Sequence, residues 1–392
     1  NHQNALMDAL AVVFTLNRQP VFLTRADVFK NKIVASILYY LKMLPVYRIR
    51  DGYSTLKEND EIFNNTIKVI KNKNGLVILP EGNHAGFRRL RQLKKGICRV
   101  AFQADEASDF RLNIKLIPVG LEFSHYTRYR QVLTVVYGKP VEVSEYHDLY
   151  RESPEIALNE LRKKLSSEMQ KVMVHIESET DYEAIDELRS LINGRYSDDI
   201  KFPKLFRDRI LIKKLNNLKE TNASLYKKIC SLSLKIKRKA KELKTDYILL
   251  AKKKHPLGWL IAGAIALLAS SPLFIYGNIF NLTFLSIPNL QSRKIKDVQF
   301  RGTMKYGMSL AFALILTPVF LILSFILFSP WWLSILVFLT IPLSGLFAWI
   351  FYLELRRIIG GFRIKNYLWH NNKKYLTLKR EYDELVSLVA GL

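Results

Sequence analysis

The spacing of apolar residues in the first 145 positions alternates between that of strands and that of helices. Short apolar runs bounded by turn residues predict strands at residues 21–24, 46–50, 76–79, 114–123 and 132–143. Between them, apolar positions three or four residues apart predict helices at residues 28–41, 56–71 and 93–104. This alternation predicts an α/β fold, a layered domain with a mixed, largely parallel sheet, which we place at residues 1–150. In such a sheet the functional site lies at the strand ends, where loops collect.

Past this domain the pattern becomes helical. Residues 154–194 predict one or two amphipathic helices, and residues 201–254 predict a helical hairpin rich in lysine and arginine. We therefore expect residues 151–254 to form a helical, basic segment.

Three apolar stretches then predict a helical membrane domain at residues 255–355. Residues 306–328 and 331–353 are each long enough to cross a bilayer, which takes ~20 residues. Residues 257–290 are divided at Ser271-Pro272 into two shorter runs, so we predict a bent, re-entrant hairpin there, with its freed backbone groups held by protein neighbours. Residues 356–392 are expected to form a cytosolic C-terminal helix.

The charge balance adds an anionic partner to this picture. The chain holds 60 lysines and arginines against 35 acidic residues, a formal net charge of +25. Anionic membrane lipid and nucleic acid are both candidates, and the apolar stretches favour lipid, because a nucleic-acid binder would have no use for membrane spans. The basic cluster at residues 235–241 is either the solvated face of a helical hairpin or a polybasic surface lying on lipid headgroups.

The distribution of positive charge also predicts an orientation in the membrane. Basic residues lie on both sides of residues 257–290 and again after residue 353, whereas the turn at Ser329-Pro330 is uncharged. Positive charge favours the cytoplasmic side, so we expect an integral membrane protein whose first domain lies on the cytoplasmic face. The two cysteines, Cys98 and Cys230, lie far apart and form neither a disulfide framework nor a metal-binding spacing.

Candidate chemistry begins at the start of the chain, where His2 and Asp8 lie six positions apart. A neutral imidazole held by a carboxylate can take a proton from a hydroxyl. Six residues on one helix would point the two side chains in different directions, but they can meet if His2 lies in a loop and Asp8 in the first turn of a helix capped by Asn4. The alternative is that Asp8 only complements the helix dipole and His2 is an ordinary loop residue.

Three further blocks follow in the predicted domain. Residues 44–50 (LPVYRIR) form a short strand with two arginines, residues 77–84 (VILPEGNH) form a strand that ends in Pro-Glu-Gly, and residues 116–120 (LIPVG) form a strand with a Pro-x-Gly break. Together with the first block, and in this order and spacing, they resemble the glycerolipid acyltransferase superfamily, which includes glycerol-3-phosphate and 1-acylglycerol-3-phosphate acyltransferases. The resemblance covers roughly the first 145 residues.

This sequence departs from the family pattern at two places. The family's first block is Asn-His-x-x-x-x-Asp, whereas five residues separate His2 from Asp8 here. This spacing looks like the variant found in fungal-type glycerol-3-phosphate and dihydroxyacetone-phosphate acyltransferases. The family's third block is Phe-Pro-Glu-Gly-Thr-Arg-Ser, so His84 occupies the position of its arginine. Because the family begins its first block after a strand, we also expect a segment of the protein to precede Asn1.

The resemblance implies residue roles. His2 would be the general base and Asp8 would orient its imidazole, with no acyl-enzyme. The acceptor site would be formed by residues of the second and third blocks and the loop that follows: Arg50, Glu81, Gly82, Asn83, His84 and Arg88. We expect no metal and no cofactor, because metal-independent acyl transfer accounts for the same residues.

The sequence thus predicts an acyltransferase that moves a fatty acyl chain from acyl-CoA or acyl carrier protein to a phosphorylated glycerol. The acceptor is either glycerol 3-phosphate, which the wide first block favours, or 1-acylglycerol 3-phosphate. Two alternatives stay open. One is a transacylase that takes its acyl chain from a phospholipid, and the other is an inactive polybasic membrane-binding scaffold.

Overall fold

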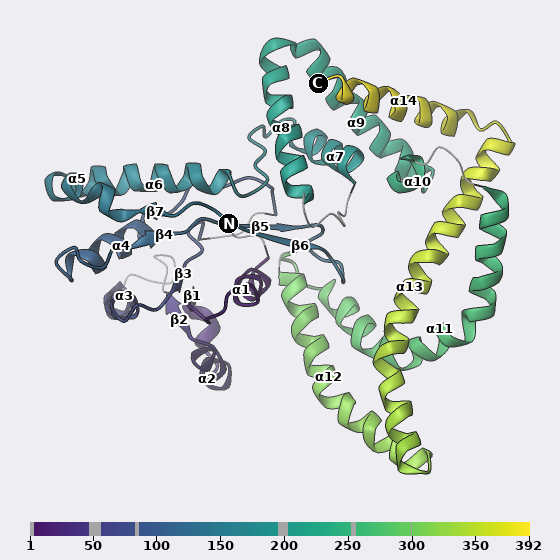
Figure 1. Ribbon diagram of the computed structural model, residues 1–392, viewed down its shortest axis with the longest axis horizontal. Coiled ribbons are helices and arrows are strands. Elements are labelled where there is room, and N and C mark those ends of the chain that lie inside the picture. The colour runs from purple at the N-terminus through teal and green to yellow at the C-terminus, as the bar shows by residue number, and fades with distance from the viewer. Residues whose placement is uncertain (1–3, 47–55, 83–85, 195–202, 252–255, 299) are drawn as a thin grey trace. The chain divides into compact units, whose positions relative to one another are not determined.

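The computed structural model describes residues 4–46, 56–82, 86–194, 203–251, 256–298 and 300–392 (Figure 1). The chain forms two compact units, Asn1–His175 and Ile176–Leu392. The first unit extends past the boundary predicted at residue 150, because helix α6 (Pro154–Gln170) packs its buried face on helix α4 (Gly96–Glu106) and on the segment around Val141 and Val143.

The centre of the first unit is a small parallel sheet with the strand order β2-β1-β3. Strand β1 (Val21–Arg25) lies between β2 (Met43–Val46) and β3 (Leu76–Val77). Helix α1 (Leu6–Val13) packs on this sheet and shares a buried apolar cluster with it. The predicted parallel character of the sheet is therefore confirmed, although the described sheet is smaller than the predicted one.

Antiparallel ladders complete the first unit. The predicted strand at residues 114–123 is interrupted at Pro118, so β4 (Lys115–Leu116) pairs with β7 (Val141–Glu142), while β5 (Val119–Phe123) pairs with β6 (Leu133–Tyr137). The backbone at Val172 passes close to Gly120 in β5. A Cβ built on Gly120 would lie 1.8 Å from the Val172 carbonyl oxygen, so a larger residue would not fit there.

The helices of the first unit follow the predicted order with shifted ends. The predicted helix at residues 56–71 is confirmed as α3 (Leu56–Lys71), and the one at residues 93–104 is α4. The predicted helix at residues 28–41 is divided into the 3₁₀ turn η1 (Ala26–Phe29) and helix α2 (Lys32–Tyr40), because the Asn31 side chain accepts hydrogen bonds from the Ile33 and Val34 N–H groups and caps a new helix there. A 3₁₀ turn η4 (Val143–Tyr146) and the short helix α5 (His147–Glu152) lead into α6.

The second unit begins with a helical module, as the sequence predicts. Its helices are α7 (Tyr182–Asn193), α8 (Lys204–Thr221), α9 (Ala223–Glu242), α10 (Tyr247–Ala251) and the C-terminal α14 (Lys373–Ala390). Helix α14 is amphipathic and lies beside α9, to which the Lys228–Glu384 and Lys239–Glu381 ion pairs join it. Part of the basic charge of α9 is therefore neutralised inside the module.

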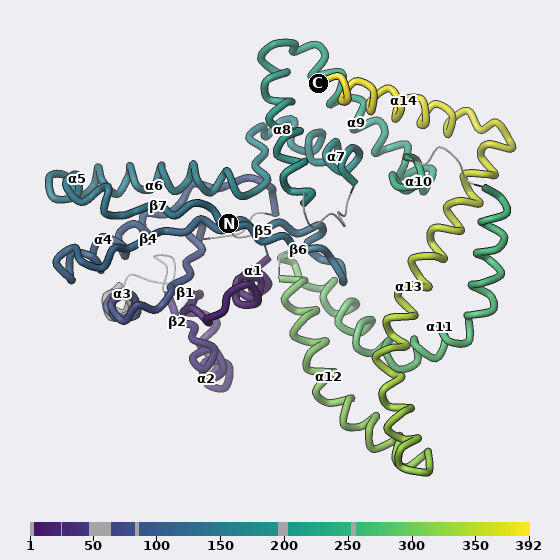
Figure 2. The backbone as a smooth tube through the Cα atoms, in the orientation of Figure 1, coloured from purple at the N-terminus to yellow at the C-terminus, as the bar shows by residue number. Residues whose placement is uncertain are grey.

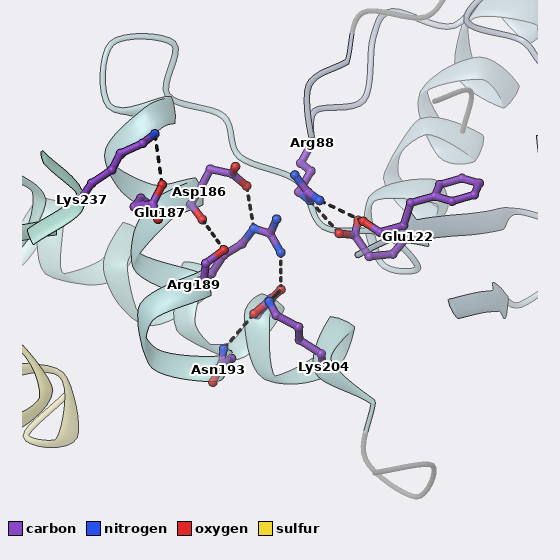
Figure 3. A network of polar contacts seen from close by, with 11 residues as sticks. Arg88, Glu122, Asp186, Glu187, Arg189, Asn193, Lys204 and Lys237 are labelled. Carbon is purple, nitrogen blue, oxygen red and sulfur yellow. Dashed lines mark hydrogen bonds and ion pairs between the residues drawn. The ribbon is translucent and has the colours of Figure 1, made fainter. Parts of the chain in front are cut away.

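A buried ion cluster joins α7 to α8 in this module (Figure 3). Asp208 is fully buried and accepts hydrogen bonds from Arg189 Nη1 (2.7 Å), Asn193 Nδ2 (2.9 Å) and Lys204 Nζ. Arg189 Nε also donates to Asp186 Oδ1 at 2.7 Å. Each charge in the cluster has a partner of opposite sign, which makes its burial tolerable.

Three helices of the second unit are long and apolar enough to cross a membrane: α11 (Leu257–Ser292), α12 (Phe300–Leu327) and α13 (Trp331–Trp369). The two spans predicted at residues 306–328 and 331–353 lie within α12 and α13. Helix α13 continues well past residue 353, so the predicted C-terminal helix at residues 356–392 is wrong as one element: its first part belongs to α13 and its second part is α14.

The two short runs that the sequence divides at Ser271-Pro272 form one element, because α11 runs through both Pro272 and Pro288 as one helix. The ribbon of α11 changes direction along its length, and the tube in Figure 2 continues from it into α12 and then α13. Whether the bent helix crosses the membrane or re-enters it stays a prediction, since α11 qualifies as a span by length and composition.

Helices α11 and α13 pack closely through small and polar residues. A Cβ built on Gly277 would lie 2.4 Å from the Ser344 carbonyl oxygen, so the two backbones approach each other directly. Asn281 Nδ2 donates to the Ile341 carbonyl oxygen at 3.0 Å, and the Tyr276 hydroxyl lies 2.6 Å from Thr340 Oγ1. Close approach with interhelical hydrogen bonds is the usual way in which membrane helices associate.

Candidate active site

The described strands of the first unit relate the second and third blocks to one another. Strands β2 and β3, in which or next to which these blocks begin, are both parallel to β1, so the carboxyl ends of the three strands lie at the same edge of the sheet. Helix α1 precedes β1 and packs on the sheet, and a helix that leads into a strand runs back over it. The described part of the first block lies at the start of this helix.

Asp8 lies fully buried in the first turn of α1. Its Oδ2 accepts a hydrogen bond from the Asn4 backbone N–H at 2.8 Å. The carboxylate is thus folded back over the start of the helix, toward the residues that precede it. The predicted placement of Asp8 in the first turn is confirmed. His2 lies outside the described residues.

Asn4 does not cap this helix, contrary to the prediction. The N-cap is Ala5, and no side chain bonds to the first turn from that position. The Asn4 side chain is fully buried, and its Nδ2 donates to the Tyr126 carbonyl oxygen at 3.1 Å. A contact with a residue so distant in sequence outweighs the local capping preference, because the side chain satisfies a backbone carbonyl of the loop after β5.

Arg88, which follows the third block, lies against the same loop. It is buried, and its Nε donates to Glu122 Oε1 at 2.6 Å while Nη2 donates to the Phe123 carbonyl oxygen at 3.0 Å (Figure 3). Its guanidinium carbon also lies 5.2 Å from the centre of the Tyr126 ring. The end of β5 and Tyr126 therefore contact both the first block, through Asn4, and the third block, through Arg88.

The third block itself is a tight turn. Gly82 has a φ of 66°, a left-handed conformation that glycine adopts without strain, and its N–H donates to the Leu79 carbonyl oxygen at 3.1 Å. Glu81 is buried, and its Oε2 accepts from the Arg91 N–H at 3.3 Å. Because this bond occupies the Gly82 N–H, an anion could bind to that N–H only if the turn opened.

The basic residues after the third block differ in their surroundings. Lys95 is paired with Glu155 at 2.7 Å, whereas Arg91 and Lys94 are exposed. Both exposed residues lie next to the turn: the Lys94 N–H donates to the Pro80 carbonyl oxygen at 2.8 Å, and Lys94 Cγ lies 3.7 Å from a Cβ built on Gly82. In the described structure, Arg91 and Lys94 are thus the cations beside Glu81 and Gly82 that have room for an anionic group.

Three of the acceptor-site residues inferred from the sequence, Arg50, Asn83 and His84, lie outside the described residues. Their roles stay predictions, as do those of Glu81, Gly82 and Arg88. Among the described residues, no group of three or more histidines, cysteines, aspartates and glutamates is arranged to hold a metal ion.

Cys98 is not a nucleophile at neutral pH. Its side chain is fully buried in α4, and this burial raises the pKa of its thiol to about 11, although the nearby Arg162 charge opposes the shift. The thiol therefore stays protonated and packs as a small apolar group among its neighbours in the core.

Sequence reasoning missed the contribution of the segment after the fourth block. Tyr126 and Glu122 belong to no family motif, and the sequence offers no local pattern that marks them. A charged residue at position 122, in the middle of an otherwise apolar strand, was the one signal available, because a buried carboxylate requires a partner.

Comparisons with known proteins find relatives of the first part of the chain. Residues 1–122 match the family model described as Acyltransferase. Glycerol-3-phosphate O-acyltransferase 2 of Saccharomyces cerevisiae is 27% identical over 134 residues, which is 34% of this chain and 18% of that protein. Glycerol-3-phosphate O-acyltransferase 1 of the same yeast is 26% identical over 160 residues, 38% of this chain and 20% of that protein.

The matches therefore span about a fifth of the length of these curated relatives. No solved structure matches the chain. The buried Asp8, the Pro-Glu-Gly turn and the two yeast relatives lead to the same conclusion: the N-terminal part of this chain is an acyltransferase domain of the glycerolipid acyltransferase superfamily.

Proposed function

We propose that the protein is a membrane-bound acyltransferase that transfers a fatty acyl chain from a thioester donor to a hydroxyl of glycerol 3-phosphate. The donor is acyl-CoA or acyl carrier protein, and the product is a 1-acylglycerol 3-phosphate. The names of the two yeast relatives favour glycerol 3-phosphate over 1-acylglycerol 3-phosphate as acceptor. The three candidate membrane spans support the membrane-bound part of this proposal.

In the proposed reaction His2 takes the proton from the acceptor hydroxyl, whose oxygen attacks the thioester carbonyl carbon. The resulting tetrahedral intermediate collapses, the carbon–sulfur bond breaks, and the imidazolium of His2 returns the proton to the leaving thiolate. Asp8 orients the imidazole and stabilises its charged form. The observation that supports this assignment best is the buried Asp8 carboxylate, which is folded back by its bond to the Asn4 N–H toward the residues that precede the helix.

The acceptor phosphate would bind among the cations near the third block. Glu81 and Gly82 form the turn, and Arg50, Asn83 and His84 are the family-derived candidates next to it. The described structure adds Arg91 and Lys94, which are exposed beside that turn. Arg88 is buried and supports the site without facing the solvent, because its guanidinium donates to Glu122 and to the Phe123 carbonyl oxygen.

The base is tested with the purified full chain in lipid nanodiscs, by following free thiol released from acyl-CoA. His2→Ala and Asp8→Asn should each lower turnover by ~10²–10⁴-fold. The same unit supplies a matched control, since His147 Nε2 lies 2.8 Å from Asp105 Oδ2 in a second His–Asp pair outside the blocks. His147→Gln should keep its turnover near that of the parent, and near-normal turnover in His2→Ala would refute the mechanism.

The acceptor site is tested by the Michaelis constant for glycerol 3-phosphate. Arg91→Ala and Lys94→Ala should raise this constant several-fold, because each removes a positive charge that attracts the phosphate, while the constant for acyl-CoA stays the same. Lys95→Ala, whose charge is already paired with Glu155, is the control. An effect on the acyl donor alone would show that these residues line the other half of the site.

The same assay separates the alternatives. A transacylase would release no thiol from acyl-CoA but would move a labelled chain from a phospholipid to the acceptor. An inactive scaffold would bind vesicles and transfer no chain from either donor.

A further inference from the structure

Helix α2 of the first unit is an apolar helix that the rest of the described structure leaves uncovered. It has nine residues, and none of them is buried. Only Ala35 and Leu38 turn partly inward, and Leu38 packs against the cluster formed by α1, β1, β2 and β5. Apart from Tyr39, whose ring centre lies 5.1 Å from that of Phe29, the remaining apolar side chains of α2 are largely exposed.

These exposed side chains form one stripe. Ile33, Val34, Ile37, Tyr40 and the following Leu41 recur at the spacing that places residues on a single helix face. Three of them are among the most exposed large apolar residues of the unit, with 74% exposure for Ile33, 54% for Ile37 and 85% for Tyr40. Single exposed apolar residues are common, but a continuous apolar stripe marks an interaction surface.

A second segment of the same unit also exposes apolar residues. Phe14 and Leu16, at the end of α1, are 76% and 39% exposed. The loop that follows them is joined to the end of α2, because Gln19 Nε2 donates to the Leu41 carbonyl oxygen at 2.9 Å. We call the exposed apolar side chains of both segments the α2 stripe: Phe14, Leu16, Ile33, Val34, Ile37, Tyr40 and Leu41.

The charges around the α2 stripe indicate what covers it. Residues 14–42 include five basic residues and one acidic residue, Asp27. Arg18, Lys30, Lys32 and Lys42 are all exposed. Two copies of so basic a surface would repel each other, which disfavours a symmetric dimer. An anionic lipid surface, in contrast, offers hydrocarbon to the apolar residues and negative headgroups to the lysines.

The same chain also contains three candidate membrane spans, which would anchor the protein in a bilayer. We propose that the α2 stripe inserts into the interfacial layer of an anionic membrane and holds the first unit on the lipid surface by a contact separate from the spanning helices. Tyr40 suits the interface because its ring is apolar and its hydroxyl is polar. The lysines can extend their charged ends to the headgroups while their stems lie on the apolar layer.

The test places a fluorescent probe on the α2 stripe of the full chain. Ile37→Cys is labelled with a nitrobenzoxadiazole group and reconstituted into vesicles of phosphatidylcholine and phosphatidylglycerol. Cys98 and Cys230 are both buried, so they can stay in place, and the labelled parent chain gives the background. Ser36→Cys is the matched control, because Ser36 is exposed, is next to the labelled position in sequence and points about 100° away from it around the helix axis.

We expect nitroxide-bearing lipids to quench the probe at position 37 several-fold more than the probe at position 36, and aqueous iodide to show the reverse order. Adding Ile33→Glu, an exposed position, should lower lipid quenching at position 37 without changing the unfolding temperature. Vesicles of phosphatidylcholine alone should also give weaker lipid quenching.

Three results would overturn the proposal. Iodide quenching at position 37 equal to that at position 36 would show that the α2 stripe lies in water. Quenching by neither agent would show that protein covers it, from a second copy or from another part of the chain. Equal lipid quenching with and without phosphatidylglycerol would remove the role of the basic residues. None of these outcomes depends on acyl transfer, so the proposal stands or falls independently of the proposed function.

Discussion

At the scale of single residues, the buried Arg88–Glu122 pair joins two parts of the candidate site. Glu122 comes from the middle of β5, and Arg88 lies a few residues after the Pro-Glu-Gly turn. Their side chains are 7% and 9% exposed, so each charge would be costly to bury without the other. Tyr126 extends the link to Asn4, and through Asn4 to Asp8. This chain of contacts holds the loop after the third block close to the first block.

The pair predicts the effect of removing one partner. Arg88→Ala should lower the free energy of unfolding by about 3–5 kcal/mol, because it removes the positive charge that is paired with the buried Glu122 carboxylate. Glu122→Ala should cost a similar amount, whereas the double variant Arg88→Leu/Glu122→Leu should recover a large part of the loss. Thermal unfolding in detergent measures all three variants.

The same variants distinguish support from direct substrate contact. If Arg88 acts only through the pair, its conservative variant Arg88→Lys should change stability and the acceptor Michaelis constant together. A raised Michaelis constant at unchanged stability would instead place Arg88 in contact with the phosphate.

At the scale of elements, α11 shows how a helix can contain two prolines in a membrane segment. A proline lacks the N–H that would bond to the carbonyl oxygen four residues earlier. The carbonyl freed by Pro272 is that of Leu268, and Ser271 Oγ donates to it at 2.8 Å. The carbonyl freed by Pro288 is that of Phe284, and Ser309 Oγ of α12 donates to it at 2.7 Å. Both polar groups are satisfied, so α11 continues through both prolines.

This arrangement predicts a coupled pair of substitutions. Ser309→Ala should destabilise the helices by about 1 kcal/mol, because it leaves the Phe284 carbonyl oxygen without a donor in an apolar surrounding. In a Pro288→Ala variant, the N–H of residue 288 can donate to the Phe284 carbonyl oxygen. Ser309→Ala should then lower the free energy of unfolding much less. Unfolding in mixed micelles measures this double-mutant cycle.

Ser270→Ala is the control for that cycle. Ser270 Oγ donates to the Ala266 carbonyl oxygen, which keeps its ordinary helical donor, so its loss should have little effect. Equal costs for Ser270→Ala and Ser309→Ala, or no coupling with Pro288, would contradict this account of the helix.

At the scale of the whole molecule, the charges and the three candidate spans predict a membrane topology. Basic residues precede α11, follow it in the segment at residues 293–305, and return in the second half of α13. The turn at Ser329-Pro330 between α12 and α13 is uncharged. The positive-inside tendency therefore predicts that both ends of α11 and the end of α13 lie on the cytosolic side, where we also expect the acyltransferase domain. This is also the side on which acyl-CoA and acyl carrier protein are found.

Single cysteines test this topology in intact cells with an impermeant thiol reagent. The reagent should label Ser329→Cys and should not label Gln291→Cys or Asn371→Cys until the cells are opened. Gln291 is chosen because it is exposed, whereas its neighbour Ser292 is fully buried. Labelling of Gln291→Cys from outside would show that α11 crosses the membrane completely, and α12 and α13 would then have the opposite orientation.

The sequence by itself determined the features that depend on local pattern. The four motif blocks, the helix at residues 56–71 and the apolar stretches of α12 and α13 could be predicted because their signals lie within a few turns of chain. A histidine and an aspartate at the start of an apolar helix suit proton transfer, and this chemistry of the first block stays a prediction. Helix ends were less predictable, since side chains such as Asn31 decide them individually.

Only the tertiary structure decided which distant residues complete the site and the helices. Asparagine is a favoured residue at helix N-caps, yet the Asn4 side chain donates to the Tyr126 carbonyl oxygen, 122 positions away. The partner of Arg88 is 34 positions away, and the donor that lets α11 continue through Pro288 lies 25 positions from its acceptor. When only the local chain is considered, a proline predicts a break in a helix. A buried charge or carbonyl group, in contrast, pairs with a residue that the fold brings close to it. Burial makes those partners necessary, and the packing of the whole chain selects them.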